Sequence, residues 1–172
     1  MKIPCRMRAV SHFNTLALGV GLWAVASSVM AGSCAVSSSG MAFGSYQPLT
    51  FAGKVTSANV TSVAAVSVVC TGIVTGGSYS IALGPSTSVN STNPRYLTNI
   101  NGGANMVFNI YTEASYTTIW GDGTSGSLVS GSIPSADSNQ SHTVYGKIPA
   151  GQSTLKAGSF SDSLTITLTY SP

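Results

Sequence analysis

The residues best suited to covalent chemistry in this sequence are its three cysteines, Cys5, Cys34 and Cys70. Cys5 belongs to an N-terminal segment that we expect to be removed, which leaves Cys34 and Cys70 as an even pair. In an oxidising compartment such a pair forms a disulfide by default, and closing a loop of this length would stabilise the fold by about 3–4 kcal/mol in the chain-entropy model. A zinc site would need more ligands than these two thiols and His142 supply. The sequence therefore predicts a Cys34–Cys70 disulfide and neither a metal nor a cofactor.

Groups that could act as acids, bases or nucleophiles are few after residue 31, and they are scattered along the chain. They comprise one histidine and four acids: His142, Glu113, Asp122, Asp137 and Asp162. An enzyme needs such groups to converge in one place, and no two of these acids stand at a suggestive spacing. Serines are abundant, but the Gly-x-Ser-x-Gly pattern of a nucleophilic serine is absent from the sequence. We therefore predict that the chain is not an enzyme, and that His142 at a strand edge and Asp162 near the last strand are structural polar residues.

The first 31 residues have the features of a secretory signal peptide. Basic residues come first: Lys2, Arg6 and Arg8. A mostly apolar run over residues 16–25 follows, and small residues end at Ala26 and again at Ala31. The run is well short of the roughly 20 apolar residues that a membrane span needs. We expect export and cleavage after Ala31, with cleavage after Ala26 as the alternative; a lipoprotein anchored through Cys34 is disfavoured because the usual leucine before the cysteine is missing.

The remaining chain, residues 32–172, is predicted to be one domain without a membrane span. Its four basic residues balance the four acids given above: Lys54, Arg95, Lys147 and Lys156. A neutral domain gives no support for binding nucleic acid or an anionic membrane surface. So sparse a set of charges suits an exported all-β protein, and also a subunit whose copies must come close together.

The elements predicted to carry these residues are short strands joined by turns. The strongest signal covers residues 160–170, where Leu164, Ile166, Leu168 and Tyr170 alternate with three threonines. Other strands are predicted within residues 34–46, 55–70, 79–83, 95–97, 106–112, 118–120 and 142–148. The strand ending at Cys70 is apolar on both faces, which predicts burial on both or a position between a core and a covering loop, and the Ser/Gly-rich stretch up to Ser141 is predicted as loop. This pattern, without helical periodicity, predicts an antiparallel sandwich.

Four stretches of this sequence together resemble a known family. They are CAVSSSGMAFGSYQP from Cys34, VSVVCTG from Val66, MVFNIYTEASYTTIWGDG from Met106, and HTVYGKIPAGQSTLKAGSFSDSLTITLTY from His142. Their order and motifs are similar to those of the spore coat protein U domain, which is shared with subunits of archaic chaperone–usher pili. The resemblance covers nearly all of residues 34–170.

The resemblance implies a single incomplete immunoglobulin-like sandwich that lacks its last strand and leaves an apolar groove beside the strand before it. A periplasmic chaperone would fill this groove first, and a strand from a neighbouring subunit would replace it at the outer-membrane usher, by β-strand addition. The groove residues that the resemblance implies are Phe43, Tyr46, Leu164, Ile166, Leu168 and Tyr170. The expected location is the periplasm in transit and then the cell surface, or secretion.

One departure from the family concerns the segment that a polymerising subunit donates. With cleavage after Ala31, only Gly32 and Ser33 precede Cys34, which is too short to cross a groove. The expectation is a subunit that accepts a strand without giving one, in a terminal or tip position. The alternatives are a self-contained secreted coat or matrix protein, and an adhesive carbohydrate-binding module that uses Trp120 and nearby tyrosines.

Overall fold

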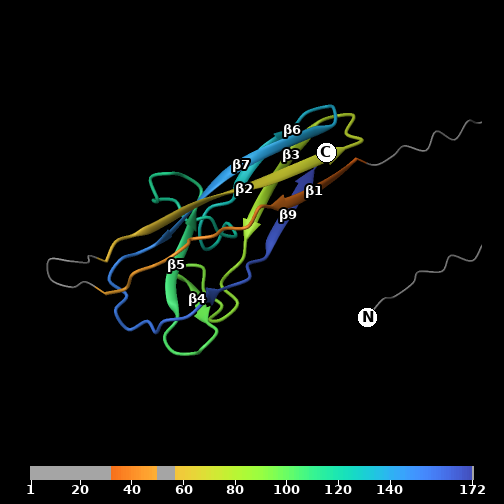
Figure 1. Ribbon diagram of the computed structural model, residues 1–172. Coiled ribbons are helices and arrows are strands. Elements are labelled where there is room, and N and C mark those ends of the chain that lie inside the picture. The colour runs from red at the N-terminus through yellow and green to blue at the C-terminus, as the bar shows by residue number, and fades with distance from the viewer. Residues whose placement is uncertain (1–31, 50–56, 172) are drawn as a thin grey trace, which may run out of the picture.

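The computed structural model describes residues 32–49 and 57–171, and within these residues it contains β-strands and no helix (Figure 1). The strands in chain order are β1 (Ser33–Ser38), β2 (Val60–Thr71), β3 (Gly77–Leu83), β4 (Arg95–Asn99), β5 (Met106–Tyr111), β6 (Val129–Ile133), β7 (Ser138–Ile148), β8 (Phe160–Ser161) and β9 (Ile166–Ser171). No helix able to cross a membrane is found in this part of the chain. The predicted signal peptide lies outside the described residues.

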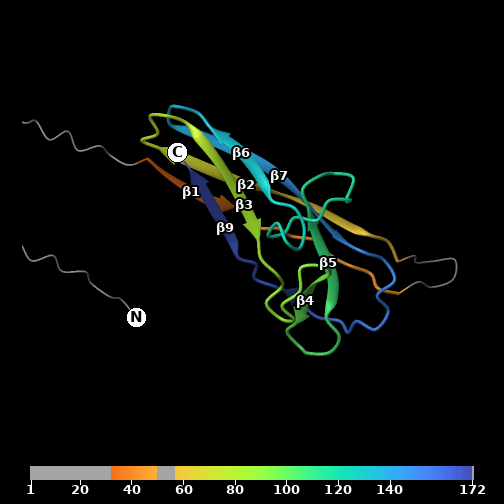
Figure 2. The same ribbon diagram turned by 180° about the vertical axis from the view of Figure 1, so that it is seen from behind.

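The strands form two antiparallel sheets. One has the order β1-β2-β7-β5-β4-β8 and the other the order β6-β3-β9. Both views of the molecule show the smaller sheet stacked against the larger one (Figures 1 and 2). Apolar side chains from both sheets fill the space between them, with Val66 and Val68 from β2 and Ile81 from β3 each at most 1% exposed. The prediction of an all-β sandwich is confirmed.

The long strand β2 is buried on one face only by the described residues, whereas the sequence predicted burial on both faces or cover by a loop on the second. Val66, Val68 and Cys70 point into the core, but Val63 is 62% exposed and Val69 is 41% exposed. The reason lies in the two-layer architecture: β1 and β7 flank β2 in the plane of its sheet, and only the face turned to the second sheet finds a covering layer.

Two local predictions in the middle of the chain were wrong. The Ser/Gly-rich stretch contains strand β6, which pairs with β3 from Gly77↔Ile133 to Ile81↔Val129. Ser and Gly have low strand propensity, so this strand is specified by its pairing and by burial of Ile133 rather than by local preference. Conversely, the predicted strand at 118–120 makes only two isolated bridges, Tyr111↔Ile119 and Trp120↔Ser127.

The predicted C-terminal strand is divided between the two sheets. β8 pairs with β4 in the larger sheet, and β9 pairs with β3 in the smaller one. Between them, Asp162 Oδ1 accepts a hydrogen bond from the Thr87 N–H at 3.2 Å, and the Gly84 N–H donates to the Thr165 carbonyl at 2.9 Å. The chain therefore crosses from one sheet to the other over residues 162–165.

Candidate functional site: an apolar groove at the sandwich edge

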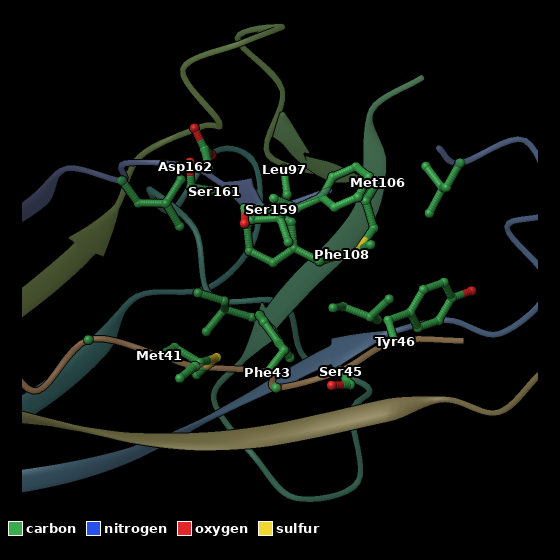
Figure 3. A pocket seen from close by; sticks show the side chains of 18 of the residues that line it. Met41, Phe43, Ser45, Tyr46, Leu97, Met106, Phe108, Ser159, Ser161 and Asp162 are labelled. Atoms are coloured by element: carbon green, nitrogen blue, oxygen red, sulfur yellow. The ribbon is translucent and has the colours of Figure 1, made fainter. Parts of the chain in front are cut away.

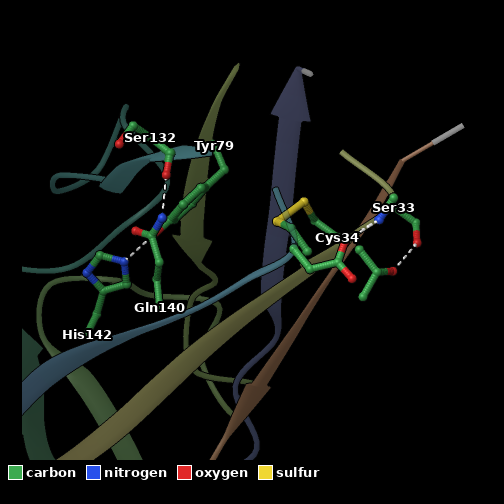
Figure 4. Close-up of a disulfide and its surroundings, with 10 residues drawn as sticks. Ser33, Cys34, Tyr79, Ser132, Gln140 and His142 are labelled. Atoms are coloured by element: carbon green, nitrogen blue, oxygen red, sulfur yellow. Dashed lines mark hydrogen bonds between the residues drawn. A yellow bond between two sulfur atoms is a disulfide. The ribbon is translucent and has the colours of Figure 1, made fainter. Parts of the chain in front are cut away.

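At one end of the sandwich edge formed by β1 and β9, a disulfide fastens β1 to its neighbour β2 in the larger sheet. Cys34 and Cys70 face each other across the β1–β2 pair with their Cα atoms 4.1 Å apart, and their sulfurs are bonded (Figure 4). The disulfide prediction is thereby confirmed. It fastens β1 to β2 along the register from Ser33↔Thr71 to Ser38↔Val66.

Beyond Ser38 the same edge opens into a groove of about 1110 Å³. Residues 38–49, which we call the first wall, line one side, and residues 155–166, the second wall, line the other. Figure 3 shows the labelled side chains of both walls on either side of β5. The floor is formed by apolar side chains from both sheets and the loop after β5: Ala64, Leu83, Leu97, Met106, Phe108, Ile110, Trp120, Val144 and Ile148.

Burial differs sharply between the floor and the walls. Most of the floor side chains are buried, with Trp120 at 1% and Phe108 at 3% exposure. The apolar side chains of the walls are only half-buried: Met41, Phe43, Tyr46, Leu155, Phe160, Leu164 and Ile166. The apolar surface that a further segment of chain would cover is therefore on the walls.

The walls also have backbone that is not paired in a sheet. Among hydrogen bonds between described residues, no backbone–backbone bond involves residues 40–49 or residues 162–164. A few of these groups are held by side chains, as where Ser62 Oγ donates to the Ala42 carbonyl at 2.7 Å. Backbone N–H and C=O groups need a partner or water, and a row of them beside an apolar groove is a template for another strand.

The first wall is positioned by a glycine on β7. The Phe43 ring stands edge-on against Phe108, with ring centroids 5.9 Å apart. An ideal Cβ at Gly146 would lie 2.6 Å from Phe43 Cζ and 2.1 Å from Met41 Sδ. A side chain at position 146 would push the ends of these two side chains away from the sheet.

Four of the six residues predicted for the groove come together in it. Phe43 and Tyr46 lie on the first wall, and Leu164 and Ile166 lie on the second. The other two do not line it: Leu168 is half-buried farther along β9, and Tyr170 is 36% exposed near the end of that strand. A role for any of them in strand binding stays a prediction.

Beneath the groove lies a buried cation, Arg95, which its sequence context predicts only as a strand residue. Arg95 is 0% exposed. Its Nη2 donates to the carbonyls of Trp120 at 2.9 Å and Leu83 at 3.1 Å, and its Nε donates to the Gly84 carbonyl at 3.0 Å. Its Nη1 donates to Asn109 Oδ1 at 2.8 Å. A lone arginine at the start of a short strand carries no sequence signal that distinguishes this role.

The electrostatics of Arg95 follow from its burial. Loss of water lowers the pKa of its guanidinium to about 10, and the negative charges of Asp162 and Asp122 oppose that shift. The group therefore stays charged at neutral pH, and its cost of desolvation is offset by four acceptors in fixed positions.

The remaining groups predicted as structural lie apart from one another. His142 is half-buried on β7, and its Nε2 is 2.6 Å from Tyr79 Oη on β3, so that it bridges the two sheets (Figure 4). On β7 it is paired with Val66 of β2, whereas the pairing of β7 with β5 covers only residues 145–147. Asp162 is hydrogen-bonded to Thr87, as described above. No cluster of three or more metal-ligating residues occurs within residues 32–49 and 57–171.

Trp120 cannot form the sugar-binding surface that one alternative required. Its ring is 1% exposed, and its Nε1–H donates to the Ile81 carbonyl at 3.0 Å inside the core. A carbohydrate platform needs an aromatic face open to solvent. Trp120 therefore cannot serve as the exposed aromatic of that module, and a role of the nearby tyrosines stays a prediction.

Comparison with known proteins gives one family match. A family model described as Spore Coat Protein U domain matches residues 21–167. No curated protein sequence matches the chain. A solved structure described as "Chaperone-tip adhesin complex is vital for synergistic activation of CFA/I fimbriae biogenesis" contains a chain that is 15% identical, with a TM-score of 0.41 over 74% of this chain and 39% of that chain. The present chain thus spans well under half the length of that protein.

Proposed function

We propose that this chain, which belongs to the Spore Coat Protein U domain family, is a structural subunit of an archaic chaperone–usher pilus or a related surface assembly. In this proposal its groove accepts an apolar β-strand from another protein. The observation that carries it is the combination, at one sandwich edge, of unpaired wall backbone with half-buried apolar wall side chains.

An added strand suits this groove for two separate physical reasons. Its backbone would give hydrogen-bond partners to the free groups of the walls, which supplies affinity independent of sequence. Its alternate side chains would point to the floor and cover the half-buried rings and aliphatic groups of the walls. Full burial of a large apolar side chain contributes about 1.5–3 kcal/mol, so a few such residues would make the interaction selective for alternating apolar segments.

The proposed partners are proteins that assemble a pilus, and no substrate is proposed. A periplasmic chaperone would supply the first strand after export, and a neighbouring subunit would replace it at the outer-membrane usher. The few residues between the predicted cleavage site and Cys34 support a subunit that accepts a strand without donating one, in a terminal or tip position. We assign it a structural and not an enzymatic role.

The test is a binding experiment on the protein matured in a bacterial periplasm. The probe is a synthetic ten-residue peptide with Ile or Val at every second position and Thr or Ser between, and a peptide of the same composition with its apolar residues grouped is the control. We expect the alternating peptide to raise the melting temperature and the grouped peptide to leave it unchanged, because only the first can present one apolar face.

A matched pair of variants identifies the groove as the place of binding. Leu164→Asp puts a charge on the second wall, whereas Thr165→Asp puts the same charge on the neighbouring exposed position. We expect Leu164→Asp to abolish the peptide effect and Thr165→Asp to keep it. A monomer whose melting temperature no alternating peptide raises, or equal loss in both variants, would contradict the proposal.

A further inference from the structure

We infer that Tyr46 and Gln152 form a clasp that closes one end of the groove and so fixes the register of the strand that the groove accepts. The inference rests on the proposed function, and it goes further by naming two positioning residues and what they determine. Both residues lie within the motifs quoted above, and 106 residues separate them in the sequence.

The hydroxyl of Tyr46 ties the first wall to the loop that leads into the second. Tyr46 Oη donates to the Pro149 carbonyl at 2.8 Å and accepts from the Gln152 N–H at 3.1 Å. Ser57 adds a parallel link, because its Oγ donates to the Gln47 carbonyl at 2.9 Å and accepts from the Gly151 N–H at 2.8 Å. The two walls are therefore held at a set separation at this end.

The side chain of Gln152 continues a sheet where a proline interrupts it. β5 and β7 pair through Asn109↔Lys147, and extending that register would put Pro149 opposite Val107. Proline has no N–H to donate. The Gln152 amide supplies this donor and also an acceptor: its Nε2 donates to the Val107 carbonyl at 2.9 Å, and its Oε1 accepts from the Val107 N–H at 2.7 Å.

The Gln152 side-chain amide also stabilises the turn over residues 149–152. Gln152 Nε2 also donates to the Pro149 carbonyl at 3.1 Å, the acceptor that Tyr46 uses. All of these bonds are part-buried and shielded from solvent competition. The clasp is therefore a connected network, and removing either side chain loosens the other.

The position of the clasp makes the groove asymmetric. In Figure 3 the Tyr46 hydroxyl points away from Met41 and Phe43, so that the ring bounds the groove while its oxygen is anchored outside it. At the opposite end, no hydrogen bond between described residues joins residues 38–42 to residues 160–166. A strand in the groove would therefore meet the Tyr46–Gln152 network toward one end, and toward the other end it would meet no hydrogen bond that joins the two walls.

The experiment measures the affinity of peptides lengthened by two residues at one end only. One series extends the alternating peptide at its N-terminus and the other at its C-terminus, and both are titrated against the protein by calorimetry. In the unmodified protein we expect one extension to bind at least about tenfold more weakly than the other, which corresponds to about 1.4 kcal/mol. In Tyr46→Phe, which keeps the ring, and in Gln152→Ala, the two extensions should bind within about twofold of each other, a difference of about 0.4 kcal/mol.

Tyr96→Phe is the control, because Tyr96 lies on β4 and does not line the groove. It should keep the asymmetry of the unmodified protein. Equal affinity of the two extensions in the unmodified protein, or asymmetry that persists in both clasp variants, overturns the clasp while leaving strand acceptance intact. If no alternating peptide binds at all, the proposed function fails and the clasp with it.

Discussion

The same two stretches of chain, residues 33–49 and 155–171, build both ends of one sandwich edge, and they do so in different ways. At the end that holds Cys34, β1 is paired with β2 along its whole length and β9 is paired with β3. At the other end, residues 40–49 leave their sheet to become the first wall, and the second wall keeps only the short β8 paired with β4 before the chain crosses to β9. We call these the closed end and the open end.

The two ends are also braced differently. The closed end has the Cys34–Cys70 bond and the contact of His142 with Tyr79 Oη between the sheets. The open end is braced from below, where Arg95 ties β4 to carbonyls at the end of β3 and after β5. This arrangement stabilises the floor through β4, β3 and the loop after β5 rather than through the first wall.

Removing the disulfide of the closed end should have the largest effect on stability. Replacing both cysteines in Cys34→Ser/Cys70→Ser, whose separation is 36 residues, is expected to lower the free energy of unfolding by about 4 kcal/mol through loop entropy. Urea denaturation of the oxidised protein and the double variant measures it. Ser37→Ala, an exposed change on the same strand, is the control. An unchanged denaturation midpoint would mean that β1 is held without the disulfide.

Removing the hydrogen bonds of Arg95 below the open end should have the second-largest effect on stability. Arg95→Met keeps much of the side-chain volume but leaves the carbonyls of Leu83, Gly84 and Trp120 without a donor inside the core. The expected loss is about 2–3 kcal/mol, measured in the same denaturation experiment. Lys147→Met, which removes a partly exposed cation from the same sheet, should cost far less. Equal effects would show that the buried network is not a brace.

Displacing the first wall should have the smallest effect on stability and a clear effect on binding. Gly146→Ala brings a Cβ against Met41 and Phe43, and overpacking of this kind costs about 1–3 kcal/mol. We expect the variant to fold and to bind the alternating peptide more weakly. Gly84→Ala is the control, because its Cβ would meet nothing closer than 3.4 Å. Peptide affinity that matches the unmodified protein would show that the wall tolerates displacement.

Sequence patterns predicted the strands well wherever the alternation of apolar residues matches the burial in the structure. Tyr79, Ile81 and Leu83 on β3 and Met106, Phe108 and Ile110 on β5 are buried at every second position, as their period of two requires. The cysteine pair was found because export and an even count leave few alternatives. Phe43, Tyr46, Leu164 and Ile166 were placed together by resemblance to a family, and the structure brings all four to one groove.

Sequence patterns failed to predict burial and strand pairing where these depend on a segment far away in the chain. Val63 and Val69 are as apolar as their neighbours, but no third layer covers them in the part of the chain that the structure describes. Strand β6 has the composition of a loop and is a strand because β3 offers its edge. The buried charge of Arg95 is accommodated by three carbonyls from two other segments. The residues next to Arg95 in the sequence give no indication of these contacts.

By itself, the sequence determined the period of the strands, the pair of thiols and the scarcity of charge, because each of these is a property of residue types at short spacing. Tertiary structure alone decided that the C-terminal stretch divides between two sheets and that the chain between them leaves a groove. It also decided that Tyr46 meets Gln152 across 106 positions. The reason is that an edge exists only where two segments fail to pair, and pairing between segments far apart in the chain is set by the packing of the whole core.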